Sequence, residues 1–270
     1  MIYPKLSAAI NQFTPTPQQK GQLKYWSSKL GDYRINQITP EMIRENLPNQ
    51  GPATKNRYLS ALFSIFNNFY TGDNPVSKVK RFREPRGRVR FLSDNERIRL
   101  LEACKKSRNP HIYPLVVISL STGCRKMELL KLTWSQVDLD RGLIYLTDTK
   151  NGENRMVPIQ GHSLQLVSEL RIGQPQWCKY VFPNRYGSFY RDMDYHWRKV
   201  LGESGITDFR WHDLRHSCAS YLSQQGVQLV HIKEILGHKS LSSTMRYVHL
   251  NASHLRGAPG NLNDMMFPDV

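Results

Sequence analysis

The feature that most constrains this chain is the stretch of residues 210–250, RWHDLRHSCASYLSQQGVQLVHIKEILGHKSLSSTMRYVHL, which is expected to form two or three helices. His212 and Arg215 stand three residues apart, so they share one helix face and can converge on one small group. An arginine fork suits a phosphate, and a histidine can carry a proton near neutral pH. The phenol oxygen of Tyr247 can form a covalent intermediate. The stretch therefore indicates phosphoryl transfer onto a protein side chain.

The charge of the whole chain favours a polyanionic partner. Lys and Arg outnumber Asp and Glu by 38 to 22, which gives a formal charge of +16. Phosphate neutralisation supplies most of the energy of non-specific nucleic-acid binding, so nucleic acid is the leading candidate. A membrane surface is disfavoured, because the sequence contains no long basic helix with an apolar face built for lipid.

The cysteines and the N-terminus indicate a cytosolic protein. Cys104, Cys124, Cys178 and Cys218 form no CxxC pair and have no zinc-ligand spacing, so we expect reduced and mostly buried thiols. The N-terminal MIYPKLSAAI lacks the apolar core of a signal peptide, and the longest aliphatic run is too short to cross a bilayer.

Helical patterns dominate the N-terminal part of the chain. Helices are expected over residues 18–30, 39–47 and 52–70, whereas residues 1–18 read as an irregular entry because of their Thr-Pro-Thr-Pro sequence. Residues 73–90 are strongly basic and are interrupted by proline and glycine, which is typical of a solvated linker that can also follow a phosphate backbone. We therefore expect a helical bundle over residues 1–76, a basic linker over residues 77–90 and a second domain over residues 91–270.

The second domain is expected to combine helices with a small sheet. A short helix over residues 124–130 carries Arg125 near its start and Glu128 on the same face. The period then changes to two over residues 143–147 and 156–160, which predicts an antiparallel hairpin. The chain is thus expected to be mainly α-helical, with an N-terminal helical bundle and a mixed α+β domain that carries a small antiparallel sheet.

The turn of this hairpin places one more candidate residue. Asn151-Gly152 is a strong hairpin turn signal, so Lys150 should lie beside the tip, where a loop can reach toward a ligand.

These residues occur in an order and spacing that resemble the tyrosine recombinases of the phage integrase family. The matching pieces are Ser121-Thr-Gly-Cys-Arg125 with Glu128-Leu-Leu130, Thr149-Lys150-Asn-Gly152, His212-Asp-Leu-Arg215-His216, Leu236-Gly-His238 and Thr244-Met-Arg-Tyr247-Val-His249. Thr54-Lys-Asn-Arg57-Tyr58-Leu59 is similar to part of the family's core-DNA-binding domain, more weakly. One expected difference is in architecture: we expect no counterpart of the extra N-terminal arm-binding domain of larger integrases.

The resemblance implies a role for each group. Arg125, Arg215 and His238 would hold the non-bridging oxygens of a DNA phosphodiester, with Glu128 orienting Arg125 or the loop before it rather than contacting DNA. Tyr247 would attack phosphorus, with His212 as its general base, to form a 3′-phosphotyrosyl link. Lys150 would protonate the leaving 5′-oxygen. The basic residues expected to contact DNA are Lys55, Arg57, Lys78, Lys80, Arg81, Arg83, Arg86 and Arg88.

The resemblance also implies partners and an origin. We expect double-stranded DNA with paired recombination half-sites, a monomer that becomes a homo-tetramer on DNA, and a possible accessory directionality factor. A bacterial, phage or mobile-element source and a cytoplasmic location follow. No cluster of Asp and Glu suggests a two-metal site, so we expect neither a metal, another cofactor nor ATP.

Two other functions are compatible with parts of the sequence. A type IB topoisomerase-like enzyme would use the same chemistry to relax DNA, and a non-enzymatic DNA-binding regulator would need only the basic charge and the helices. Taken singly, a surface arginine, a solvated lysine, a structural histidine or a packed tyrosine has an ordinary explanation. Their conjunction in family order favours strand exchange over both alternatives.

Overall fold

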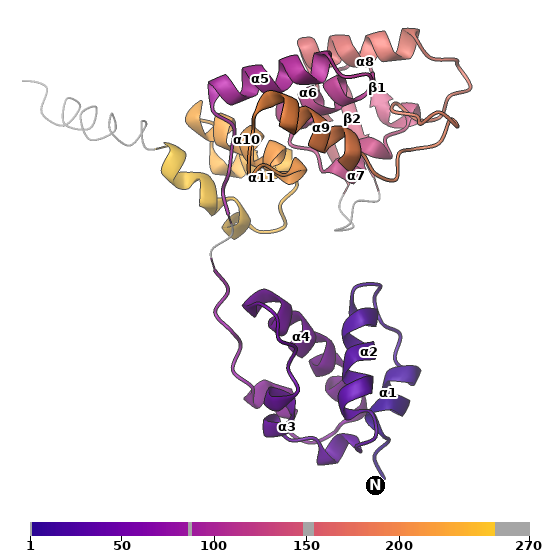
Figure 1. The fold of residues 1–270 in the computed structure, drawn as a ribbon, viewed down its shortest axis with the longest axis vertical. Helices are drawn as coiled ribbons and strands as arrows, with labels where there is room; N and C mark the ends of the chain where they lie inside the picture. The colour runs from indigo at the N-terminus through magenta and orange to yellow at the C-terminus, as the bar shows by residue number, and fades with distance from the viewer. Residues whose placement is uncertain (1, 86–87, 148–153, 252–270) are drawn as a thin grey trace, which may run out of the picture. The chain divides into compact units, whose positions relative to one another are not determined.

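The computed structural model describes residues 2–85, 88–147 and 154–251. The chain divides into two compact units, Met1–Gly87 and Arg88–Val270 (Figure 1). Each unit has its own hydrophobic core. Both are largely helical, and the second carries a small antiparallel sheet. The predicted fold class is confirmed.

The N-terminal unit is a helical bundle. Leu23, Trp26 and Leu30 lie on one face of α2 and pack against the buried side of α4, as the spacing predicts. The Thr39 hydroxyl accepts a hydrogen bond from the Met42 amide and so begins α3. The helices of this unit are α1 (Leu6–Gln12), α2 (Gln19–Leu30), α3 (Pro40–Glu45) and α4 (Pro52–Phe69), with 3-10 turns η1 (Ile35–Gln37) and η2 (Pro75–Lys78).

The prediction of an irregular entry over residues 1–18 is wrong for α1. Its buried residues are Leu6 and Ala9, and its first turn is tied to the end of α2 by Ser7, whose amide and hydroxyl both donate to the Gly31 carbonyl. A helix of seven residues has little stability alone, so it depends on this packing.

The basic segment is anchored at both of its ends. Val76 and Val79 are buried in the core of the first unit, while Arg88 forms ion pairs with Asp208 and Asp213 of the second. The expected limits of the linker, residues 77–90, therefore include residues that pack within each unit; its path along DNA stays a prediction.

The second unit packs a small sheet into the same hydrophobic core as its helices. In the sheet, of order β1-β2-β3, Ile144 of β2 pairs with Val157 of β3, which matches the predicted hairpin. The turn expected at Asn151-Gly152 lies outside the described residues. The elements are α5 (Asp94–Lys105), α6 (Ile112–Thr122), α7 (Lys126–Leu130), η3 (Trp134–Gln136), β1 (Val137–Asp138), β2 (Leu143–Leu146), β3 (Arg155–Pro158), α8 (His162–Ile172), α9 (Asp194–Ser204), α10 (Trp211–Gln224), α11 (Leu229–Leu236), η4 (Leu241–Ser243) and η5 (Met245–Asn251).

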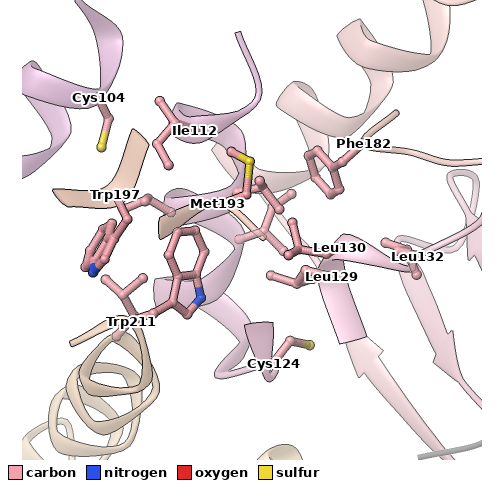
Figure 2. Packing of buried hydrophobic residues seen from close by; sticks show 14 of the residues in the cluster. Cys104, Ile112, Cys124, Leu129, Leu130, Leu132, Phe182, Met193, Trp197 and Trp211 are labelled. Atoms are coloured by element: carbon pink, nitrogen blue, oxygen red, sulfur yellow. The ribbon is translucent and has the colours of Figure 1, made fainter. Parts of the chain in front are cut away.

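Helix α10 is central to this unit. It packs against α6, α11 and η5, and its first residue, Trp211, meets Trp197 of α9 edge to face at 4.9 Å between ring centroids (Figure 2). Its buried face includes Asp213, Arg215, His216 and several serines, which is unusual for a core helix. Such groups need internal partners, and these partners define the candidate site.

Among the described helices, none is both long and apolar enough to cross a membrane.

Candidate active site

Arg215 joins three elements at the centre of the second unit. Its side chain leaves α10 and is 3% exposed. Nη1 donates to the Gly123 carbonyl at the end of α6 (2.8 Å), and Nη2 donates to the Leu236 carbonyl at the end of α11 (2.6 Å). Burial and the nearby charge of Arg125 lower the pKa of Arg215 to about 10, so it remains a cation at neutral pH.

Arg125 reaches the same place from the start of α7. The Glu128 carboxylate accepts from the Arg125 backbone amide (2.8 Å) and from Nη1 (2.7 Å), which closes the first turn of the helix and fixes the guanidinium. Nη2 points to the Gly237 carbonyl at 3.3 Å, next to His238. Glu128 thus fixes the direction of the Arg125 side chain.

Arg155 is a member of this cluster that the sequence did not reveal. It begins β3 and donates to both oxygens of Glu128, at 3.2 and 2.8 Å. Burial raises the pKa of the Glu128 carboxyl, but Arg155 and Arg125 outweigh that effect and lower it overall. A single carboxylate therefore holds two arginines, and the only local signal was a basic residue near the expected hairpin.

His212 and His238 lie close to the arginines. Nδ1 of His238 lies 2.8 Å from the Thr244 hydroxyl, and burial with the charges of Arg215 and Arg125 lowers the pKa of His238 to about 4. Burial and Arg215 also lower the pKa of His212. His212 and Arg215, with Cys124, Lys126, Arg210 and Trp211, line a cavity of about 260 Å³. Both imidazoles are therefore neutral near pH 7. Each can donate a hydrogen bond from one ring nitrogen and accept a hydrogen bond or a proton at the other.

Tyr247 lies in the buried part of the cluster. Its residue is 1% exposed, and its hydroxyl lies 2.5 Å from Nδ1 of His216, a residue to which the sequence assigned no role. The Ser223 hydroxyl donates to the Tyr247 carbonyl at 2.9 Å. Burial raises the pKa of the Tyr247 phenol to about 12, so the hydroxyl is protonated at rest.

The fold thus brings Arg125, His212, Arg215, His238 and Tyr247 into one cluster, although they come from four separate segments. Lys150 lies outside the described residues. The catalytic role of each group stays a prediction.

The basic residues predicted to contact DNA differ in their surroundings. Arg57, Lys80 and Arg83 are exposed, and within the described part of the chain they form no ion pair. Arg86 lies outside the described residues. The others have internal partners: Lys78 pairs with Asp73, Arg88 with Asp208 and Asp213, Arg81 donates to the Asn56 carbonyl, and Lys55 lies over the ring of Phe82.

The cysteines are free and buried, as predicted. Across residues 2–85, 88–147 and 154–251, no group of three or more His, Cys, Asp or Glu side chains is arranged to hold a metal ion.

The sequence model of the phage integrase family matches residues 90–254, which include every described member of the cluster. The chain belongs to the phage integrase family. The predicted resemblance is confirmed.

Individual relatives agree. The chain is 34% identical over 233 residues to the integrase of Haemophilus phage HP1, a match that covers 84% of this chain and 65% of that integrase. It is 31% identical over 182 residues to the tyrosine recombinase XerA of Saccharolobus solfataricus, covering 67% of this chain and 58% of XerA. The match thus spans less than two thirds of either relative.

Solved structures share the fold. The match to the catalytic domain of bacteriophage HP1 integrase covers 68% of this chain and all of that domain, with 32% identity and a TM-score of 0.53. A lambda integrase dimer bound to a core site gives a TM-score of 0.72 over 91% of this chain and 77% of that one, with 17% identity. XerH in a post-cleavage complex with a palindromic difH substrate gives a TM-score of 0.68 over 88% of this chain and 75% of that one, with 23% identity.

Proposed function

We propose that this chain is a site-specific DNA recombinase that cuts and rejoins DNA through a covalent tyrosine intermediate. The observation that carries the proposal is the convergence of the buried Arg215, the half-buried Arg125, a histidine and a tyrosine hydroxyl within the segment that matches the phage integrase family. XerH and lambda integrase were solved on DNA, and the charge of +16 suits the same partner.

The chemistry follows from the side chains. Arg125, Arg215 and His238 donate to the non-bridging oxygens of a phosphodiester, where negative charge grows in the transition state. The Tyr247 oxygen attacks phosphorus and forms a 3′-phosphotyrosyl bond as the bond to the 5′-oxygen breaks. His212 takes the phenol proton, and Lys150 gives a proton to the leaving 5′-oxygen.

The same intermediate accounts for rejoining. Attack of a 5′-hydroxyl on the phosphotyrosyl bond restores the phosphodiester and releases Tyr247, so bond energy is conserved and neither ATP nor a metal enters the reaction. Exchange between duplexes follows when paired half-sites are held by four protomers, assembled on DNA from free monomers in the cytoplasm and aided by a directionality factor.

DNA contact is assigned to the basic residues of the first unit and the linker. Within the described part of the chain, the side chains of Arg57, Lys80 and Arg83 form no ion pair and can bind phosphates directly. The other four, Lys55, Lys78, Arg81 and Arg88, would have to give up their present partners within the protein to bind DNA. Arg86 completes the set.

The test is a nicked suicide substrate that traps the covalent complex, with the wild type and Tyr247→Phe. We expect an adduct resistant to denaturation with the wild type only, because Phe has no nucleophilic oxygen. Tyr186→Phe is the matched control, since that tyrosine is exposed and lies outside the cluster. An adduct formed by Tyr247→Phe contradicts the assignment; relaxed plasmid without recombinants at paired sites points to a topoisomerase-like enzyme.

A further inference from the structure

The hydroxyl of Tyr247 has one described hydrogen-bond partner, and it is His216. The contact measures 2.5 Å from Nδ1 to the phenol oxygen, across 31 positions in the sequence. His216 is 8% exposed, so water has little access to the ring. A buried hydroxyl without a partner is destabilising, which makes this contact important for the position of the ring.

A second contact fixes the backbone of the same residue. Ser223 donates to the Tyr247 carbonyl at 2.9 Å. His216 and Ser223 are seven residues apart on α10, so they lie two turns apart on one face. Ala219 lies between them and packs with Tyr247, Ile232 and Leu236 in a small apolar cluster. One face of α10 therefore holds the tyrosine at its ring, its hydroxyl and its carbonyl.

The direction of the hydrogen bond follows from proton affinity. Burial and the neighbouring His212 lower the pKa of His216 to about 4, whereas burial raises that of Tyr247 to about 12. Both groups are therefore neutral near pH 7. A phenol O–H is a stronger acid than a neutral imidazole N–H, so we assign the phenol as the donor and Nδ1 as the acceptor, with the ring proton on Nε2. His216 is too weak a base to take this proton at rest. The ring of His216 lies 5.0 Å from the ring of His212, which is one helical turn earlier. His216 accepts the hydrogen bond, and His212 is the residue assigned as the general base.

We propose that His216 is a positioning residue that holds the hydroxyl of Tyr247 at α10 and so aligns the nucleophile with the phosphate held by the arginines. This inference rests on the proposed function. The orientation of the phenol is set before DNA arrives, so less conformational freedom is lost in reaching the transition state.

Two substitutions separate holding from proton transfer. His216→Asn keeps an acceptor, because its Oδ1 is attached to Cγ as Nδ1 is, but it cannot titrate. His216→Leu removes the acceptor. We expect single-turnover cleavage at saturating protein to fall about ten- to a hundredfold in the Leu variant, with unchanged DNA affinity, and to be largely retained in the Asn variant.

A measurement without DNA reports the contact directly. In protein labelled with 3-fluorotyrosine, the 19F resonance of Tyr247 is assigned by its loss in Tyr247→Phe. We expect the wild type and His216→Asn to give the same shift with a small response to D2O, and His216→Leu to give a changed shift and a larger response. His111→Leu is the control, because His111 is a half-buried histidine that packs near Phe182 and Tyr190.

The outcomes are distinct. Wild-type cleavage by a folded Leu variant, or equal loss in the Asn and Leu variants, overturns the positioning role. If the wild type forms no adduct with any DNA, the proposed function fails, and the 19F comparison alone then decides whether His216 holds the hydroxyl; an unchanged resonance in the Leu variant refutes it.

Discussion

Glu128 shows how a single carboxylate organises the cationic centre. It accepts from Arg125 and Arg155 and is itself largely buried, with 11% of its side chain exposed. Two arginines brought this close repel each other, and both repel Arg215. The carboxylate offsets that repulsion and directs Arg125 toward the C-terminal end of α11, next to His238.

At this scale we predict that Arg155→Met slows DNA cleavage about tenfold, less than the two to three orders of magnitude expected for the loss of Arg125 itself. Without Arg155, Glu128 is free to pair more fully with Arg125 and to draw it from the phosphate. The rate of adduct formation on the suicide substrate measures this effect.

Arg141→Met is the control, because that side chain is 75% exposed. Equal rates for Arg155→Met and wild type would show that Glu128 does not need its second arginine.

At the scale of elements, the helix ends build the site. The carbonyls that Arg215 binds belong to Gly123 and Leu236, at the ends of α6 and α11, where the macrodipole places partial negative charge. Gly123 has a φ of +64°, a left-handed conformation that closes α6 and turns its carbonyl toward α10. A cation at the meeting of two helix ends thus serves stability as well as the site.

Gly123→Ala is expected to destabilise the second unit by about 3 kcal/mol. The left-handed backbone costs an alanine roughly 1 kcal/mol, and its Cβ would lie 2.3 Å from Leu236 Cδ2, which adds overpacking of about 2 kcal/mol. Urea unfolding followed by tryptophan fluorescence measures the difference.

Gly205→Ala isolates the backbone part, because Gly205 has a φ of +65° but nothing within 4 Å of the added Cβ. If Gly123→Ala lowers the free energy of unfolding no more than Gly205→Ala does, Leu236 and the end of α11 can move away from the added Cβ at no cost.

At the scale of the whole molecule, excess positive charge is distributed over two units with separate cores. In the second unit, a carboxylate holds the half-buried Arg125 and carbonyls hold the buried Arg215. Lys80 and Arg83 of the basic segment are exposed. Phosphates of a duplex would release counterions when they meet such free cations.

The double substitution Lys80→Ala and Arg83→Ala is therefore expected to reduce the slope of log K against log salt concentration by about two, for binding to any duplex sequence. Fluorescence anisotropy over a range of salt concentrations gives the slope. Lys80→Arg with Arg83→Lys should leave it unchanged, and an unaltered slope in the double-alanine variant would remove both residues from the interface.

Much of this protein follows from its sequence. The spacing of Leu23, Trp26 and Leu30 predicted α2, the alternation near Ile144 predicted the hairpin, and ordered motifs indicated the family. These signals are local, since they depend on neighbours within a few positions. Helix α1 and the two-residue strand β1 escaped them, because packing rather than propensity stabilises such short elements.

The contacts between those residues were decided by the tertiary structure alone. The sequence named Tyr247 as the nucleophile but not His216 as its partner, 31 positions away, and named Glu128 but not Arg155, 27 positions away. Residue types determine which chemistry is possible. Which atoms meet depends on how α10, β3 and η5 pack, because burial forces each polar group to find a partner through space.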